Sequence, residues 1–205
     1  MTQEYGLKVS RLEGLTDGIF AIAMTILVLD LQLPRGLILP QNLANELREE
    51  IFLKLFVYVG SFIILGTCWV AMQFQMSALE RVNRTYLWTH VFYLMGVCVV
   101  PFSASLMAEY PDTAVSIYFF ACNLLFISLN QYVIYCCSLF YGLNKPFYTG
   151  EVRYAIVRRI FVAPVFYVAA LVLAQWNTHI AFILLIVPTL IYVKPGLIDK
   201  LAASK

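Results

Sequence analysis

The stretch RLEGLTDGIFAIAMTILVLDLQLP, residues 11–34, reads as a membrane-spanning helix with a charged entrance. Arg11, Glu13 and Asp17 stand at its start, and Thr25 is the only polar residue between Asp17 and Asp30. The apolar run ends in LVLDLQLP, without the small residues of a cleavage site. An uncleaved first span is therefore predicted here rather than a signal peptide.

The composition of the chain predicts an integral membrane protein. Of its 205 residues 61% are hydrophobic and 13% charged, whereas a soluble domain carries about 25% charged residues. The mean hydropathy is +0.80. A net charge of +2, with basic residues scattered along the chain, gives no sign of nucleic-acid binding.

Apolar stretches of about 20 residues, long enough to cross a hydrocarbon core of about 30 Å, occur six times. They predict an all-α membrane protein with a single six-helix domain over residues 1–205. The predicted spans are 14–33, 53–76, 86–108, 113–138, 158–175 and 178–193. The polar segment 34–50, between the first two spans, is expected to form a short surface helix.

The distribution of basic residues orients these spans. If the N-terminus is cytoplasmic, only three of the 14 Lys and Arg residues, Arg35, Arg48 and Lys54, fall on the outer side. That asymmetry agrees with the positive-inside rule. Both termini are therefore expected to be cytoplasmic.

Signatures of catalysis are missing from the sequence. It contains no HExxH, GxSxG, CxxC or phosphate-binding glycine loop, so we expect neither an enzyme nor a cofactor or metal. The cysteines lie in apolar runs and are interpreted as core residues. His90, early in the third span, is interpreted as a hydrogen-bonded residue of the bundle, with a proton relay as the alternative. Asn83, just before that span, is a second candidate for a polar network.

Known signatures of ion transport are also missing. There is no TVGYG-like segment and no regular series of arginines, so a channel would not have the tetrameric carbonyl-filter fold of potassium channels. A coupled carrier would need carboxylates near the membrane midplane, and none is present there. Polar residues inside the spans, such as Asn130 and Gln131, are expected to form hydrogen bonds between helices.

The first span has two distinct faces. Because each residue of an α-helix advances by about 100°, Ile22, Ile26 and Leu29 share one stripe with Thr25. Asp17 faces away from that stripe and is expected to hold its charge against a partner at the inner end. Ordinary apolar packing would give a similar stripe, so periodicity alone does not assign its role.

The segment RLEGLTD, residues 11–17, resembles the R-x-x-x-F-S-D signature of the transmembrane protein 175 family of potassium channels. Leu15 replaces the aromatic residue of that signature, and Thr16 replaces its serine. The resemblance continues through residues 18–34, and the six-span layout covers almost all of the chain. It implies that Arg11 and Asp17 belong to a structural polar network near the inner mouth of the span.

The resemblance also implies a function. Prokaryotic six-span members are homotetramers in which the first helix of each copy lines the pore, and Ile22 falls at the family's constricting isoleucine. Ile26 and Leu29 would add apolar layers, and Thr25 would add a ring of hydroxyls. The expected activity is passive, leak-like and moderately potassium-selective conduction across a lipid bilayer, in the cell membrane of a prokaryote, through a hydrophobic gate.

Two other functions remain open from the sequence. A secondary transporter of a small cation or metabolite would show saturable, coupled flux that depends on deep polar groups such as Asn130 or Gln131. An accessory membrane protein would show no flux.

Overall fold

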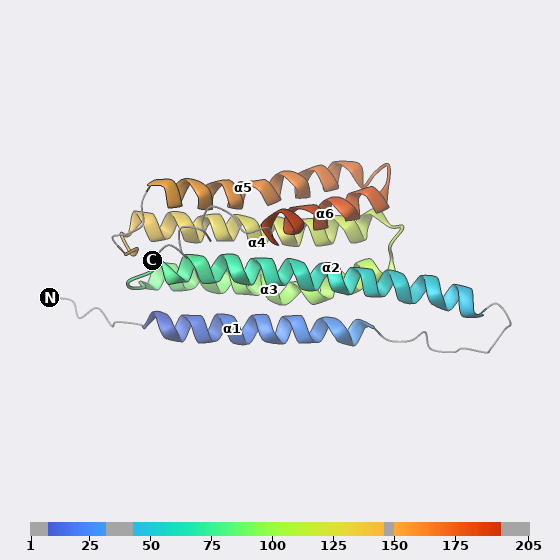
Figure 1. Cartoon of the computed structure of the whole chain (residues 1–205), viewed down its shortest axis with the longest axis horizontal. Helices are drawn as coiled ribbons and strands as arrows, with labels where there is room; N and C mark the ends of the chain where they lie inside the picture. Colours follow the sequence, from blue (N-terminus) through green and yellow to red (C-terminus); the bar gives the residue numbers. More distant parts are fainter. Residues whose placement is uncertain (1–7, 32–42, 146–149, 194–205) are drawn as a thin grey trace.

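The computed structural model of the protein describes residues 8–31, 43–145 and 150–193, which form a bundle of helices running alongside one another (Figure 1). The described helices are α1 (Val9–Ile26), the 3₁₀ turn η1 (Leu27–Asp30), α2 (Leu43–Ser77), α3 (Arg84–Glu109), α4 (Ala114–Phe140), α5 (Gly150–Leu173) and α6 (Thr178–Val193). Within these ranges there is no β-strand, only an isolated bridge between Leu79 and Asn144. The predicted all-α class is confirmed.

Four of the described helices are long and apolar enough to cross a membrane. These segments are Val9–Leu29, Ile51–Ser77, Arg84–Glu109 and Ala114–Phe140. Two shorter apolar helical segments, Ile160–Leu173 and Thr178–Leu190, coincide with the last two predicted spans. The chain is an integral membrane protein with several apolar helices.

The start of α2 differs from the prediction. Residues 43–50, expected to lie in a separate surface helix, form the first turns of α2, whereas residues 34–42 lie outside the described ranges. The sequence LANELREE consists mostly of good helix formers, and neither Gly nor Pro follows before Gly60, so nothing interrupts the helix. The N-terminal turns of α2 extend past the neighbouring helices (Figure 1).

A continuous buried apolar cluster, to which all the described α-helices contribute, holds the bundle together. α3 lies at its centre, in contact with α1, α2 and α4, and the Tyr86, Tyr93, Val97 and Val100 side chains are fully buried. α5 and α6 pack against each other and against α4. The substantial contacts of α1 are with α2, α3 and its own extension η1. One side of α1 is therefore left uncovered in a single chain.

The α2–α3 turn and the segment after α4 are joined by the main chain at the end of the bundle where α1 begins (Figure 1). The Glu80 amide donates to the Leu143 carbonyl at 2.9 Å, and the Lys145 amide donates to the Ala78 carbonyl at 2.9 Å. Gly142 has a φ of +59° in this segment. Because that left-handed conformation suits glycine, Gly142 allows the chain to turn back toward α2.

Candidate functional site

The two faces of α1 differ sharply in their surroundings. Its buried residues recur every three or four positions and face α2 and α3: Leu12, Thr16, Phe20 and Ala23, followed by Leu27 in η1. Ile22 and Leu29, on the opposite side, are 60% and 62% exposed. Leu15, Thr25 and Ile26 are exposed on this side as well. The stripe predicted from the sequence is thus an uncovered apolar face of the isolated chain.

Thr16 joins the buried face of α1 to α3. Its hydroxyl oxygen Oγ1 lies 2.8 Å from the Leu12 carbonyl oxygen and 2.8 Å from Nε2 of His90. Both Thr16 and His90 have no exposed surface. The His90 ring lies between the rings of Tyr86 and Tyr93, with centroid distances of 6.1 and 5.9 Å. Packing and a hydrogen bond therefore fix the rotation of α1 at this level.

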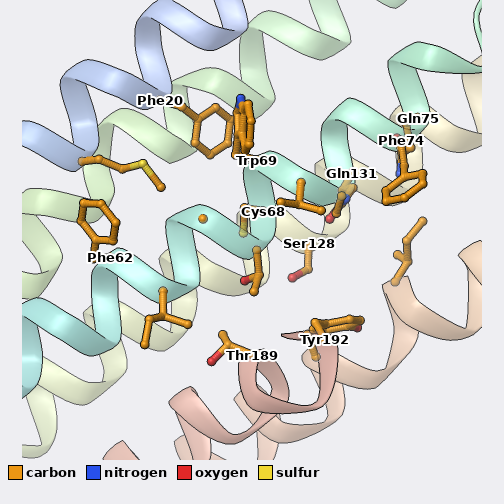
Figure 2. Close-up of a pocket in the computed structure, with 18 of the residues that line it drawn as sticks. Phe20, Phe62, Cys68, Trp69, Phe74, Gln75, Ser128, Gln131, Thr189 and Tyr192 are labelled. Atoms are coloured by element: carbon orange, nitrogen blue, oxygen red, sulfur yellow. The ribbon is translucent and has the colours of Figure 1, made fainter. Parts of the chain in front are cut away.

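Asp17 joins α1 to α2. Its Oδ1 atom accepts a hydrogen bond from Trp69 Nε1 at 2.8 Å and one from Gln73 Nε2 at 2.5 Å. Figure 2 shows the Trp69 ring projecting from α2 toward Phe20 of α1. The carboxylate thus ties α1 to α2 by two donors, and hydrogen bonds to a charged acceptor are stronger than those between neutral groups.

The other predicted polar residues occupy separate places. Arg11 is exposed, and its side chain bonds to no residue within the described ranges. Asn83 caps α3, where its Oδ1 accepts a hydrogen bond from the Tyr86 amide at 2.8 Å. The structure therefore brings Thr16 and His90 together, but it does not link Asn83 or Arg11 to them.

The hydroxyl of Thr25 donates to the Ile22 carbonyl at 2.9 Å. Because this bond runs back along the same helix, the hydroxyl oxygen keeps lone pairs available at the uncovered face. That face otherwise presents apolar side chains. Residues 8–31, 43–145 and 150–193 contain no group of three or more His, Cys, Asp or Glu side chains placed to hold a metal ion. An apolar face of this kind can contact lipid, pack against another helix or form part of the wall of a narrow pore.

The sequence predicts a partner for Asp17 but does not identify Trp69 or Gln73 as that partner. A signal for them existed, because Trp69 and Gln73 are four residues apart and so lie on the same side of a helix. What the sequence lacked was the rotation of α2 relative to α1, which depends on packing across the bundle.

A family model described as the endosomal/lysosomal potassium channel TMEM175 matches residues 11–101, from the start of α1 to Pro101 in α3. A potassium channel of Streptomyces collinus is 35% identical over 102 residues, which cover 49% of this chain and 48% of that protein. A potassium channel of Chamaesiphon minutus is 32% identical over 101 residues, 49% of each chain. The endosomal/lysosomal proton channel TMEM175 of Danio rerio is 24% identical over 141 residues, 69% of this chain and 26% of that protein. The matched regions span about half of the bacterial relatives and about a quarter of the fish protein.

The fold is similar to a solved structure, the crystal structure of a lysosomal potassium-selective channel TMEM175 homolog from Chamaesiphon minutus. The TM-score is 0.73 at 21% identity, over 90% of this chain and 95% of that chain. The matched residues 11–101 contain Thr16, Asp17, Trp69, Gln73 and His90, which hold α1 in place. Residues 11–101 of this chain are therefore similar to the family of the endosomal/lysosomal potassium channel TMEM175, and the fold of the chain is similar to that of a solved homolog.

Proposed function

We propose that the protein is a moderately potassium-selective cation channel in which four copies surround a central pore lined by α1. The observation that carries this proposal is the uncovered apolar face of α1, with Ile22 60% exposed and Leu29 62% exposed, opposite a face locked by Thr16 and Asp17. A single helix face cannot enclose a pore, so several copies have to contribute one each. The names of the bacterial relatives, which are potassium channels, support the choice of ion.

In this proposal the Ile22 side chains form the narrowest apolar collar, and Ile26 and Leu29 form further layers. Narrow hydrophobic constrictions gate by dewetting, and an ion has to lose part of its hydration shell to pass. Potassium holds its hydration water less tightly than sodium, so such a collar favours potassium modestly without a cage of carbonyls. Thr25 supplies the one ring of hydroxyl oxygens along this path.

The proposed orientation places the beginning of α1 in the cytoplasm, together with the α2–α3 turn and the segment after α4. Lys8, Arg11, Arg81, Arg84 and Lys145 lie at or next to the helix ends of that side. Basic residues at one end of the bundle support a cytoplasmic location for it under the positive-inside rule. With α5 and α6 as short spans, both termini would be cytoplasmic.

Flux in liposomes tests the proposal. The purified protein is expected to carry potassium faster than sodium, and Ile22→Asn is expected to raise conductance and bring the potassium-to-sodium ratio closer to one. Ile183→Asn is the matched control, because Ile183 is a 53% exposed isoleucine on α6 and lies outside the proposed pore.

Single-channel recording separates a channel from a carrier, since only a channel gives unitary current steps. Absence of flux in the wild-type protein would contradict the proposed activity. An unchanged ion ratio in Ile22→Asn would contradict the assignment of the constriction.

A further inference from the structure

A groove of about 450 Å³ is lined by both α3 and α4. We call it the α3–α4 groove. Its lining comes from α3 residues between Arg84 and Phe92 and from Asn130 and Val133 of α4. Arg84 is the first residue of α3, so the groove begins at the end of the bundle where α1 also begins (Figure 1).

The two ends of the groove lie at different depths in a membrane. α3 has 26 residues and is apolar enough to cross a bilayer. At about 1.5 Å per residue it is about 39 Å long, whereas the hydrocarbon core is about 30 Å thick. Trp88, one turn after Arg84, is 57% exposed, and tryptophan is enriched at the boundary between membrane and water. The Arg84 end of the groove therefore lies among lipid head groups, and the Phe92 end lies among acyl chains.

Hydrogen-bond donors are concentrated at the Arg84 end. The guanidinium of Arg84, the hydroxyl of Thr85 and the indole N–H of Trp88 donate to no residue within the described part of the chain. Further along the groove, the Thr89 hydroxyl donates to the Thr85 carbonyl at 2.9 Å, so its proton is already used within α3. The donors that remain are thus placed where a head group would meet them.

The charge of the groove restricts its ligand. Arg84 is the one charged side chain among the described residues that line it. A phosphate suits this end, because a guanidinium can donate two parallel hydrogen bonds to it. A cationic head group would be repelled by Arg84 and would find no carboxylate in the lining. Pockets between membrane helices that contain basic residues are typical sites for anionic lipid head groups.

The apolar end of the groove distinguishes a lipid from a free anion. Phe92 and Val133 are 50% and 49% exposed, and an inorganic anion at Arg84 would leave both of them uncovered. A phospholipid occupies both ends at once, because its acyl chains continue from the phosphate toward the membrane interior. Burial of these two side chains under an acyl chain then adds to the contacts of the head group.

We propose that the α3–α4 groove binds an anionic phospholipid. Arg84 and the Thr85 hydroxyl donate to the phosphate, the Trp88 indole lies at the level of the glycerol backbone, and an acyl chain covers Phe92 and Val133. This site is on a different face from Ile22 and the proposed pore, so its test needs no measurement of ion flux and its failure would leave the proposed channel function untouched.

The test uses the full-length protein in nanodiscs of phosphatidylcholine that contain a small fraction of photoreactive lipid. One sample receives phosphatidylglycerol with a diazirine in the upper part of an acyl chain, and another receives phosphatidylcholine with the same group. We expect the phosphatidylglycerol probe to give more adducts in peptides that contain residues 88–92 and 130–133. Unlabelled phosphatidylglycerol should reduce these adducts, whereas an excess of inorganic phosphate should not.

Replacement of the arginine tests the head-group contact. Arg84→Gln should lower the phosphatidylglycerol adducts in these peptides about fivefold, as expected for the loss of one basic contact to an anionic lipid. Labelling by phosphatidylcholine should stay the same, and Arg84→Lys should keep most of the phosphatidylglycerol labelling. Arg11→Gln is the matched control, because it removes the same charge from an exposed position at the start of α1, outside the groove.

Val133→Trp is a second variant that keeps Arg84 and fills the apolar end of the groove, so it should lower labelling by both probes. Val165→Trp is its control, because Val165 is 65% exposed on α5 and lies outside the groove. Circular dichroism and size-exclusion chromatography verify that each variant is folded.

Several outcomes would overturn the proposal. These are equal phosphatidylglycerol labelling of Arg84→Gln and the wild-type protein, equal labelling by the two lipid probes, and loss of the adducts in inorganic phosphate. A disulfide between copies carrying Val133→Cys in a cysteine-free background would also overturn it, because a second copy would then cover the groove.

Discussion

The Thr16 hydroxyl and the His90 imidazole meet at 2.8 Å in the interior of the bundle, where neither residue has any exposed surface. A hydroxyl has a single proton to donate. The Oγ1 atom of Thr16 also lies 2.8 Å from the Leu12 carbonyl oxygen, which can only accept a hydrogen bond. With the Thr16 proton on the Leu12 carbonyl, Nε2 of His90 is the donor to Thr16 and Nδ1 is the unprotonated nitrogen. Nδ1 has no hydrogen-bond partner among the described residues. The neutral imidazole with its proton on Nε2 is the form that fits this site.

Replacement of Thr16 by valine removes this contact while nearly preserving the side-chain volume. His90 would then keep a buried N–H group without an acceptor, so we expect the free energy of unfolding to fall by about 1–3 kcal/mol. Denaturation in mixed micelles, followed by circular dichroism, measures the change. Thr16→Ser keeps the hydroxyl and should lose less stability than Thr16→Val. Equal losses in the two variants would show that packing, rather than the hydrogen bond, holds α1 here.

The two hydrogen bonds at Asp17 make a different prediction. Asp17→Leu removes the acceptor for both Trp69 and Gln73, and should destabilise the contact between α1 and α2 by about 1–2 kcal/mol. Loss of a fully buried charged group would cost more, but Asp17 is exposed and solvent screens its charge. Asp17→Asn retains an acceptor oxygen and should lose about half as much. The thermal midpoint in detergent compares the three proteins. Asn and Leu variants that are both as stable as the wild-type protein would rule out a structural role for this acceptor.

Cysteine cross-linking tests which face of α1 meets another copy. With the native cysteines replaced, Ile22→Cys is expected to give disulfide-linked dimers under mild oxidation. A disulfide needs two Cα atoms about 4–7 Å apart, and we expect the Cα atoms of position 22 in neighbouring copies to come this close around a narrow symmetric pore. Phe20→Cys, two positions away on the buried face, should remain monomeric on a non-reducing gel. Dimers from Phe20→Cys but not from Ile22→Cys would reverse the proposed orientation of α1.

Gly96 sits at a close approach between α3 and α4. A Cβ atom there would lie 2.8 Å from Ile127 Cγ1 and 2.9 Å from Phe126 Cδ1, so Gly96→Ala should destabilise the protein by about 1–2 kcal/mol despite the better helix propensity of alanine. Gly60→Ala is a useful comparison, because its nearest contact at 2.8 Å is the flexible end of the Ile186 side chain. We expect Gly60→Ala to be close to neutral in the same unfolding measurement. A neutral Gly96→Ala would mean that the Ile127 and Phe126 side chains move aside at little cost.

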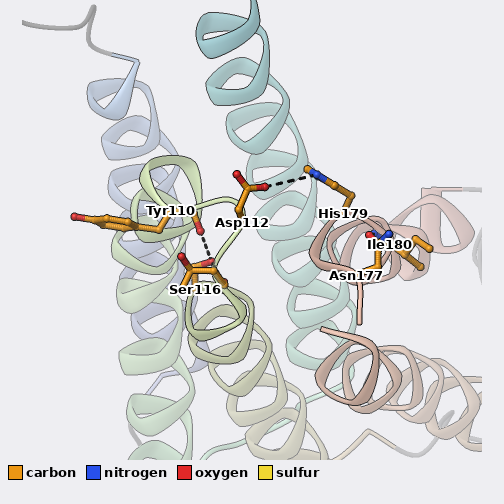
Figure 3. Close-up of polar contacts among 7 residues, drawn as sticks. Tyr110, Asp112, Ser116, Asn177, His179 and Ile180 are labelled. Atoms are coloured by element: carbon orange, nitrogen blue, oxygen red, sulfur yellow. Dashed lines mark hydrogen bonds and ion pairs between the residues drawn. The ribbon is translucent and has the colours of Figure 1, made fainter. Parts of the chain in front are cut away.

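The pair formed by His179 and Asp112 lies at the end of the bundle opposite the start of α1, and it should contribute little to stability. Nε2 of His179 lies 3.7 Å from Oδ1 of Asp112, and the two side chains are 71% and 84% exposed (Figure 3). Exposed pairs of this kind typically contribute under 1 kcal/mol, so His179→Gln is expected to change the free energy of unfolding by less than about 0.5 kcal/mol. A clearly larger loss that disappears in high salt would show that the α3–α4 and α5–α6 connections depend on this contact.

Much of the fold follows from the sequence because long apolar runs directly limit where helices lie in a membrane protein. Every predicted span contains a described helix, although α5 begins eight residues before position 158. The error at residues 43–50 arose because polarity suggested a helix on the membrane surface, whereas the continuous run of helix formers extended α2 instead.

The site was only partly accessible from the sequence, for a physical reason. The sequence predicts that Ile22 and Asp17 lie on different sides of α1, because this placement depends only on residue spacing within one helix. The partnership of Asp17 with Trp69, and that of Thr16 with His90, depends on how three helices rotate against one another. That rotation is determined by side-chain packing between segments far apart in the chain, which a single sequence does not reveal.

The connection between the α2–α3 turn and the segment after α4 includes two hydrogen bonds between main-chain atoms, from Glu80 to Leu143 and from Lys145 to Ala78, beside one from the Lys145 side chain to the Ser77 carbonyl. Such bonds are available to almost any sequence, provided that the chain can turn as it does at Gly142. The two main-chain bonds therefore couple the two halves of the bundle at this end whatever side chains α4, α5 and α6 carry. This agrees with a family signature that ends within α3 while the fold extends across 90% of the chain.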